Sequence, residues 1–85
     1  MLIKWGPQAE IDFQVWQKKN KKITQKIKNL IRDIKRSPYT GLGRPKALKY
    51  KLSGFYARRI NEKHRLIYMI LDSTLFIESC KGHYD

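Results

Sequence analysis

Hydrophobic residues recur at helical spacing through the first half of the chain. One helix is predicted from Gln8 to Lys18, because apolar residues return every three or four positions along one side of it. Its apolar positions are Ala9, Ile11, Phe13, Val15 and Trp16. A second helix is predicted to end at Ser37, since the residue before Pro38 is pushed out of the helical region. Its apolar face consists of Ile23, Ile27, Leu30, Ile31 and Ile34.

The pattern changes to that of strands in the second half. Apolar residues alternate with polar ones, or form short continuous runs between turn signals, in residues 48–52, 55–60, 64–71 and 74–80. A further short strand, residues 2–5, precedes Gly6-Pro7. We therefore predict an α+β domain in which an N-terminal strand and a helical hairpin pack on one face of an antiparallel sheet. Residues 1–85 form a single domain in this interpretation.

The charge of the chain indicates a polyanionic partner. The 85 residues carry 19 basic and 7 acidic side chains, which gives a net charge of +12. Such an excess costs self-repulsion in a small domain and is typical of proteins that bind nucleic acid. The hydrophobic content of 41% suffices for one modest core, so we expect an open groove rather than a large enclosed cavity.

Other partners and cofactors are less compatible with the sequence. No apolar run approaches the roughly 20 residues that span a bilayer, and residues 1–5 do not resemble a signal peptide. Cys80 is the only cysteine, so no intrachain disulfide can form, and a cytoplasmic location fits best. With only His64 and His83 besides, no metal-ligand spacing is present, and no cofactor is expected. We interpret Cys80 as a small buried residue.

Basic residues of the predicted strands are candidate RNA ligands. Neighbouring strands lie only about 5 Å apart, so their side chains can converge on one face. The residues concerned are Lys49, Lys51, Arg58, Arg59 and Arg65, interleaved with the aromatic residues Tyr50, Phe55, Tyr56 and Tyr84. Aromatic rings could stack on bases, or Tyr50 and Tyr56 could simply fill the core. The lysines of the second helix (Lys22, Lys26 and Lys35) are either solvated surface or a phosphate-binding face.

The pair His83-Tyr84 is the sharpest local feature. Imidazole is the side chain best suited to donating a proton near neutral pH, and RNA cleavage needs a donor for the leaving 5′-oxygen. Arg65 and Lys49 could supply the cations that stabilise the crowded phosphate. A terminal histidine is also common as plain surface. His64 is expected at a turn edge or partly buried.

The sequence resembles the Txe/YoeB family, toxins of type II toxin–antitoxin systems within the RelE superfamily. The resemblance runs along essentially the whole chain. It is carried by Trp5, Trp16, Lys21, Leu30–Asp33, Pro38, Gly41–Pro45, Leu48–Lys49, Leu52–Gly54, Arg58–Ile60, His64–Leu66 and His83–Tyr84. It implies a microbial-RNase-like fold and metal-free, ribosome-dependent cleavage of mRNA.

The resemblance also implies roles and partners. His83 corresponds to the general acid, Arg65 to the arginine that stabilises the transition state, and Tyr84 to a tyrosine that orients the terminal site. The cations expected to face RNA are Lys49 and Arg59, together with Arg44, Lys51 and Arg58. The implied partners are a YefM-type antitoxin, the 70S ribosome with mRNA, operator DNA through the antitoxin complex only, and a second copy of the chain.

Lys46 departs from the family pattern. The family has a glutamate at this position, assigned as general base, whereas the chain reads Arg44-Pro45-Lys46. A lysine accepts a proton only when neutral, a state that an exposed groove rarely sustains at neutral pH, so we expect Lys46 to bind phosphate instead. Three explanations stay open: an attenuating substitution that lets a lethal protein be produced, natural drift to a weakened toxin, or another proton acceptor such as Asp85. A non-catalytic ribosome-binding protein and an antitoxin-bound corepressor are the alternative functions.

Overall fold

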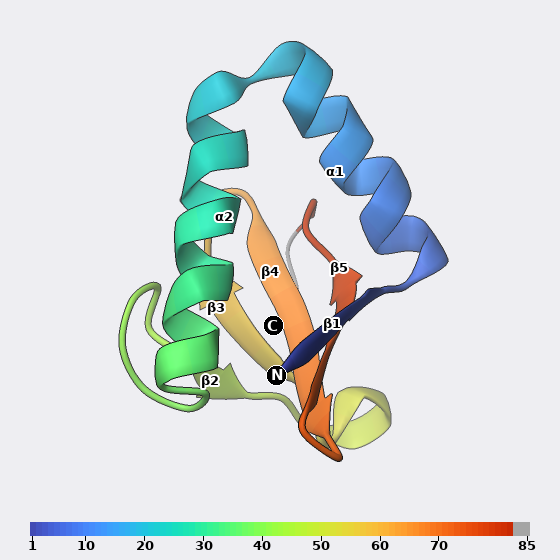
Figure 1. The fold of residues 1–85 in the computed structure, drawn as a ribbon, viewed down its shortest axis with the longest axis vertical. Coiled ribbons are helices and arrows are strands. Elements are labelled where there is room, and N and C mark those ends of the chain that lie inside the picture. The colour runs from blue at the N-terminus through green and yellow to red at the C-terminus, as the bar shows by residue number, and fades with distance from the viewer. Residues whose placement is uncertain (83–85) are drawn as a thin grey trace.

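Two helices form where the hydrophobic spacing predicts them. In the computed structural model, which describes residues 1–82, helix α1 spans Pro7–Lys19 and helix α2 spans Lys21–Arg36 (Figure 1). Proline suits the first position of α1 because its fixed φ is helical and its missing N–H would have no helical partner. Asn20 separates the helices and caps α2: its side-chain oxygen accepts a 3.0 Å hydrogen bond from the Ile23 N–H.

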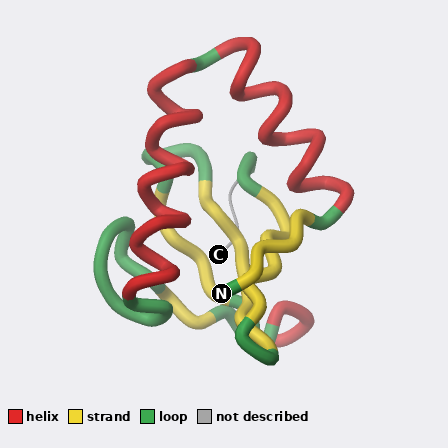
Figure 2. Tube along the Cα trace, in the orientation of Figure 1, coloured by secondary structure: helices red, strands yellow, loops and turns green. Residues whose placement is uncertain are grey.

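Five strands form one sheet behind the helices (Figure 2). They are β1 (Leu2–Trp5), β2 (Lys46–Ala47), β3 (Tyr56–Arg59), β4 (Arg65–Leu71) and β5 (Thr74–Ser79), in the order β1-β5-β4-β3-β2. The α+β class is confirmed, but the sheet is mixed rather than antiparallel, because β1 pairs parallel with β5. These two strands are not consecutive in the chain, so no hairpin turn forces them into opposite directions.

The strand predicted at residues 48–52 was wrong. Tyr50–Leu52 forms a single 3₁₀ turn, in which the Ser53 N–H donates to the Tyr50 carbonyl at 3.0 Å. Leu48 is buried and Leu52 half-buried, but the Tyr50 side chain between them is 92% exposed. An apolar pair four residues apart fits a helical turn as well as a strand, and only the orientation of Tyr50 distinguishes the two.

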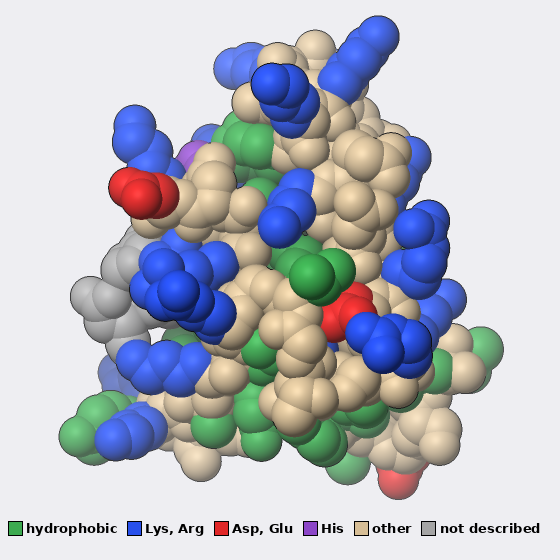
Figure 3. Space-filling model, turned by 90° about the vertical axis from the view of Figure 1, so that its left-hand side faces the viewer, with side chains coloured by type: hydrophobic (Ala, Val, Ile, Leu, Met, Phe, Trp, Pro, Cys, Tyr) green, Lys and Arg blue, Asp and Glu red, His purple; other side chains and the backbone are tan. Residues whose placement is uncertain are grey.

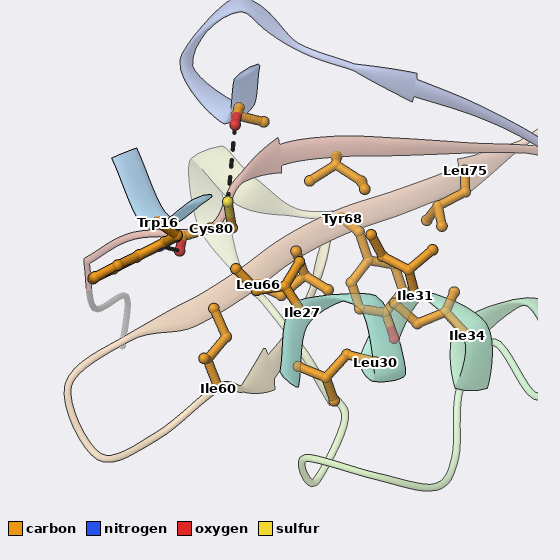
Figure 4. Packing of buried hydrophobic residues seen from close by; sticks show 12 residues of the cluster. Trp16, Ile27, Leu30, Ile31, Ile34, Ile60, Leu66, Tyr68, Leu75 and Cys80 are labelled. Atoms are coloured by element: carbon orange, nitrogen blue, oxygen red, sulfur yellow. Dashed lines mark hydrogen bonds between the residues drawn. The ribbon is translucent and has the colours of Figure 1, made fainter. Parts of the chain in front are cut away.

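The main core lies between the helices and the sheet (Figure 4). Helix α1 contributes Ala9 and Trp16, whereas Ile11, which the pattern placed on the buried face, is 55% exposed. Cys80 is fully buried here, as predicted, and burial together with the Asp12 carboxylate raises the pKa of its thiol to about 12. A second, smaller cluster on the other sheet face comprises Leu48, Ala57 and Ile67, with Leu52 and Phe55 packed against it.

Arg58 is fully buried and joins four parts of the fold. Its Nη1 donates to Asp33 at 2.7 Å and its Nε to the Tyr68 hydroxyl at 3.1 Å. The remaining hydrogen bonds of the guanidinium go to the carbonyl oxygens of Ser37, Thr40 and Leu42. A buried charge is tolerated only when it is paired and hydrogen-bonded, and Arg58 meets both conditions. It fastens the loop after α2 to β3 and β4.

Asp33 is the anion of this network. Its carboxylate pairs with Arg36 and Arg58 and accepts a 2.9 Å hydrogen bond from the Leu42 N–H. The Leu42 N–H and the two guanidinium groups hold the pKa of Asp33 well below its ordinary value of 3.8. Ionised Asp33 therefore contributes its full stabilisation at pH values above the ordinary pKa of 3.8. The contribution is lost as the pH falls from there through the lower pKa of the folded state.

Replacing Arg58 should unfold the protein far more readily than replacing its neighbour. We expect Arg58→Ala to lower the free energy of unfolding by about 3–5 kcal/mol, because Asp33 would lose its buried partner. The carbonyls of Ser37, Thr40 and Leu42 would lose their donor as well. The matched control Arg59→Ala removes an exposed arginine and should change it by less than about 0.5 kcal/mol. Urea unfolding followed by circular dichroism measures both. Equal effects would contradict the structural role of Arg58.

The Cys80 thiol should be unreactive in the folded protein. Because its pKa is raised to about 12, almost no thiolate is present at pH 8, and the core also excludes reagent. We expect an aromatic disulfide reagent to react at least about 100-fold more slowly with the folded chain than with the chain in guanidinium. The absence of other cysteines makes the readout unambiguous. Comparable rates in the two states would show that the site opens easily.

Candidate nucleic-acid interface

The register of the sheet places three cations on the face away from the helices. Directly paired residues of antiparallel strands point to the same side. Lys46 pairs with Ala57, and Arg59 pairs with Arg65. Ala57 lies in the cluster on the second sheet face, so its partner Lys46 also points to that face. Arg59, two residues after Ala57 on the same strand, points the same way, and so does its partner Arg65. We call it the basic face and define it by these three side chains.

Arg65 is the most rigidly held of the three. Its side chain is only 8% exposed, and Nη1 donates to the carbonyl oxygens of Asn61 at 2.7 Å and His64 at 3.1 Å. Within residues 1–82 these hydrogen bonds all use Nη1, which leaves Nε and Nη2 for another acceptor. A guanidinium with a fixed orientation is suited to phosphate, whose oxygens it can bind in pairs.

A shallow pocket borders the basic face. It has a volume of about 240 Å³ and is lined by residues 46–50. Lys46 and Lys49 are exposed there, and the Tyr50 ring stands in solvent on a backbone with φ of 57°. Left-handed backbone at a non-glycine residue is uncommon and often marks functional segments. Arg44 and Lys51 flank the pocket in sequence and are also exposed.

Arg58 does not belong to the interface, contrary to the prediction from sequence. Strand alternation turns it toward the helices, where the network with Asp33 consumes its donors. Tyr56 also packs against the main core, which is the simpler of the two roles considered for it, and Phe55 packs against the second cluster. Of the candidate stacking residues that the structure describes, Tyr50 is the exposed one.

His64 is half-buried, as predicted, and contacts the end of the described chain. Its Nδ1 accepts a 2.9 Å hydrogen bond from the Gly82 N–H. Its ring packs edge-to-face against Trp16, with 4.8 Å between the ring centroids. Burial lowers the pKa of His64, and the charges of Lys81, Lys63 and Arg65 lower it further. His83, Tyr84 and Asp85, which include the predicted general acid, lie outside the described residues.

Two side chains of α1 hold the same segment, and sequence reasoning missed this role. Asp12 accepts a 3.0 Å hydrogen bond from the Cys80 N–H, and the Trp16 Nε1–H donates to the Cys80 carbonyl at 2.8 Å. The available signal was Asp12 itself, a carboxylate three residues after Ala9 and four before Trp16 on the apolar stripe. A charged residue in that position must find a partner inside the fold.

The basic excess of the composition persists at the surface, because the two buried acidic residues are matched by two buried arginines, Arg58 and Arg65. Two of the seven acidic residues, Asp12 and Asp33, are buried and already hydrogen-bonded. Basic side chains are therefore spread over the face drawn in Figure 3 with few acidic groups between them. Among the described residues, no group of three or more His, Cys, Asp and Glu could hold a metal ion. No helix of residues 1–82 is long and apolar enough to cross a membrane.

Comparison with known proteins identifies relatives of similar length. The family model of the YoeB-like toxin of bacterial type II toxin–antitoxin systems matches residues 5–84. Toxin YoeB of Escherichia coli K12 is 44% identical over 84 residues, which cover 99% of this chain and 100% of that protein. Toxin YoeB of Synechocystis is 47% identical over 73 residues, which cover 86% of this chain and 85% of that protein.

Solved structures agree with these relatives. A YoeB/ParE toxin from Agrobacterium tumefaciens superimposes with a TM-score of 0.97 at 36% identity, covering 99% of this chain and 100% of the other. The YoeB dimer from Staphylococcus aureus gives 0.93 at 42% identity, covering 99% and 98%. YafQ from E. coli, at 22% identity and a TM-score of 0.79, shares the fold. The chain belongs to the YoeB family and is a toxin of a type II toxin–antitoxin system.

Proposed function

We propose that this toxin binds the ribosome and cleaves mRNA as an endoribonuclease. The observation that carries the proposal is the basic face. Arg65 is fixed by carbonyls of its own loop and lies beside Arg59, and Lys46 points to the same face from the neighbouring strand β2. The polyanion that such a face fits is RNA, and membership of the YoeB family supports the proposal that the RNA is mRNA on the ribosome. The proposed site of action is accordingly the cytoplasm.

The reaction is a transesterification that forms a 2′,3′-cyclic phosphate on the ribose that already carries the phosphate and frees the 5′-hydroxyl of the next nucleotide. The 2′-oxygen attacks phosphorus and loses its proton to a base, while the P–O5′ bond breaks. His83 donates a proton to the leaving 5′-oxygen, and Arg65 stabilises the negative charge on the phosphoryl oxygens. Tyr84 orients the terminal site. Lys49, Lys51, Arg44 and Arg59 bind the RNA backbone, and the exposed Tyr50 ring stacks on a base.

Lys46 binds phosphate in this scheme. It is exposed on β2, and a solvated lysine ammonium is a hydrogen-bond donor rather than a proton acceptor. The proton of the 2′-hydroxyl then passes to water or to another group, and turnover is slower than with a carboxylate at this position. The same substitution favours a second candidate function, in which the chain occupies the ribosome without cutting.

The antitoxin is the expected regulator. Structures of the YoeB–YefM complex from S. aureus are similar to this fold, with a TM-score of 0.91 at 44% identity. We propose that a YefM-type antitoxin covers the basic face with acidic residues, and that operator DNA is bound through that complex. A homodimer is proposed from the S. aureus YoeB dimer.

Restoring the carboxylate should accelerate cleavage. We expect Lys46→Glu to raise the rate of mRNA cleavage on ribosomes by about 10²- to 10⁴-fold, the usual contribution of a general base. The measurement is cleavage-site mapping in a reconstituted translation system, with His83→Ala in the Lys46→Glu background as the inactive control. Equal rates for the parent chain and the Lys46→Glu variant would show that another group accepts the proton. Ribosome binding without cleavage by either chain would refute the endoribonuclease and support the binding function.

Ribosome affinity should depend on Lys49, in the pocket, and Lys51, beside it, more than on the lysines of α2. We expect the double variant Lys49→Gln/Lys51→Gln to weaken binding by about tenfold or more at roughly 150 mM salt and to lower the salt dependence by about two phosphate contacts. The matched control Lys22→Gln/Lys26→Gln removes the same charge from the helix face. Sedimentation with 70S ribosomes at several salt concentrations measures both. Equal losses would mean that binding follows net charge alone.

A further inference from the structure

The segment that leads to His83 is tied down at both ends of residues 80–82. Cys80 is held by Asp12 and Trp16 of α1, at 3.0 and 2.8 Å. Gly82 is held through both its backbone groups: its N–H donates to His64 Nδ1 at 2.9 Å, and its carbonyl accepts from the Arg65 N–H at 2.9 Å. The regular pairing of β4 with β5 ends at Ser79. Beyond it, residues 80–82 are held by these individual hydrogen bonds instead.

The contact at His64 defines the state of its ring. A backbone N–H only donates, so Nδ1 must carry the lone pair, and the proton of the neutral imidazole sits on Nε2. A protonated ring would set an Nδ1–H against the Gly82 N–H, and the hydrogen bond would be lost. The contact therefore exists only while His64 is neutral.

His64 also touches the predicted phosphate-binding group. Its carbonyl accepts from Arg65 Nη1 at 3.1 Å, and it accepts from the Ile60 N–H at 2.9 Å. One dipeptide, His64-Arg65, thus both aims a guanidinium and secures the residue that precedes His83. We propose that His64 is a positioning residue of the cleavage site, whose neutral side chain fixes Gly82, the residue that precedes the predicted general acid in the sequence. The inference rests on the proposed function.

The surroundings of His64 make the contact sensitive to acid. Lys63 and Arg65 adjoin it in sequence, Lys81 comes from the segment after β5, and Asp12 of α1 opposes these three cations. The pKa of His64 in the folded protein is lowered below its ordinary value of 6.5, first by burial and then by the cations. The contact is complete above that value and is lost as the pH falls through the lower, folded-state pKa.

Two substitutions distinguish the hydrogen-bond acceptor role of His64 Nδ1 from the packing of its ring against Trp16. His64→Asn places an amide oxygen near the position of Nδ1, and this acceptor does not titrate. His64→Phe keeps an aromatic ring against Trp16 but has no acceptor. Thermal unfolding by circular dichroism checks that both variants fold.

The first measurement is amide protection of Gly82 by NMR on the full chain. We expect the protection factor to be about tenfold lower in His64→Phe than in the parent, the effect of one lost hydrogen bond. Protection in the parent should fall as the pH drops through the lowered pKa of His64, and it should stay constant in His64→Asn. Unchanged protection in His64→Phe would overturn the proposal at its first step.

The second measurement is cleavage on ribosomes, made in the Lys46→Glu background so that a base is present. We expect His64→Phe to lower kcat by about 10- to 100-fold at unchanged KM for ribosomes, as a misplaced general acid would. His64→Asn should restore the rate to within about threefold of the parent, and its rate should lack the decline that the protonation of His64 causes in acid. If His64→Phe is as active as an active parent, the positioning role is refuted and the proposed function is not. Absence of cleavage in the parent and in every variant would refute the proposed function, and the positioning role with it.

Discussion

The buried ion pair between Arg58 and Asp33 is the interaction on which the arrangement of the basic face depends. A side-chain period of two means that a one-residue slip of β3 would exchange the faces of Arg58 and Arg59. The inward position offers a guanidinium an anion, a hydroxyl and three carbonyls. Tyr56 and Ile60, two residues to either side of Arg58, face inward with it and pack in the main core, which a slip would undo. The ion pair and these two apolar neighbours together specify the register, and the register puts Arg59 beside Arg65 and Lys46 beside Ala57.

The same pair holds the loop that delivers Lys46. Asp33 binds the Leu42 N–H while Arg58 binds the Leu42 carbonyl, so this one residue is fixed from both sides. The Arg59 N–H adds a 2.7 Å hydrogen bond to the Gly43 carbonyl. Gly43 itself has φ of 79°, and a side chain there would come within 3.0 Å of Leu30 and 2.9 Å of the Arg59 carbonyl. The glycines of this loop are therefore needed to bring β2 to the sheet edge.

The fold was largely predictable because most segments carry an unambiguous period. Both helices, the N-terminal strand and the strands from residue 55 onward follow from spacing, whereas residues 48–52 satisfy two patterns and form a turn. The site was less predictable. Arg58 and Arg59 are identical side chains on adjacent positions, and which one faces inward depends on Asp33, 25 residues away. The contacts of Asp12 and His64 with residues 80–82 likewise join parts of the chain that no local pattern connects. Lys46 was singled out only by the family resemblance, whereas Arg65 was already a candidate cation from its place in the predicted strands.

Lys46 changes the balance between binding and chemistry on the basic face. Its neighbours there, Arg59 and Arg65, are already cationic, and the two buried carboxylates cannot offset them because each is engaged by its own partners. A glutamate at this position would be the one anion among cations: it would weaken attraction to a phosphate backbone and accept a proton. Lysine reverses both effects, since it adds a cation next to Arg59 and Arg65 and removes the acceptor. On the proposed function, this toxin is therefore expected to hold its polyanionic substrate more firmly than a glutamate-bearing relative and to turn it over more slowly, so that occupancy of the ribosome becomes a larger share of its effect.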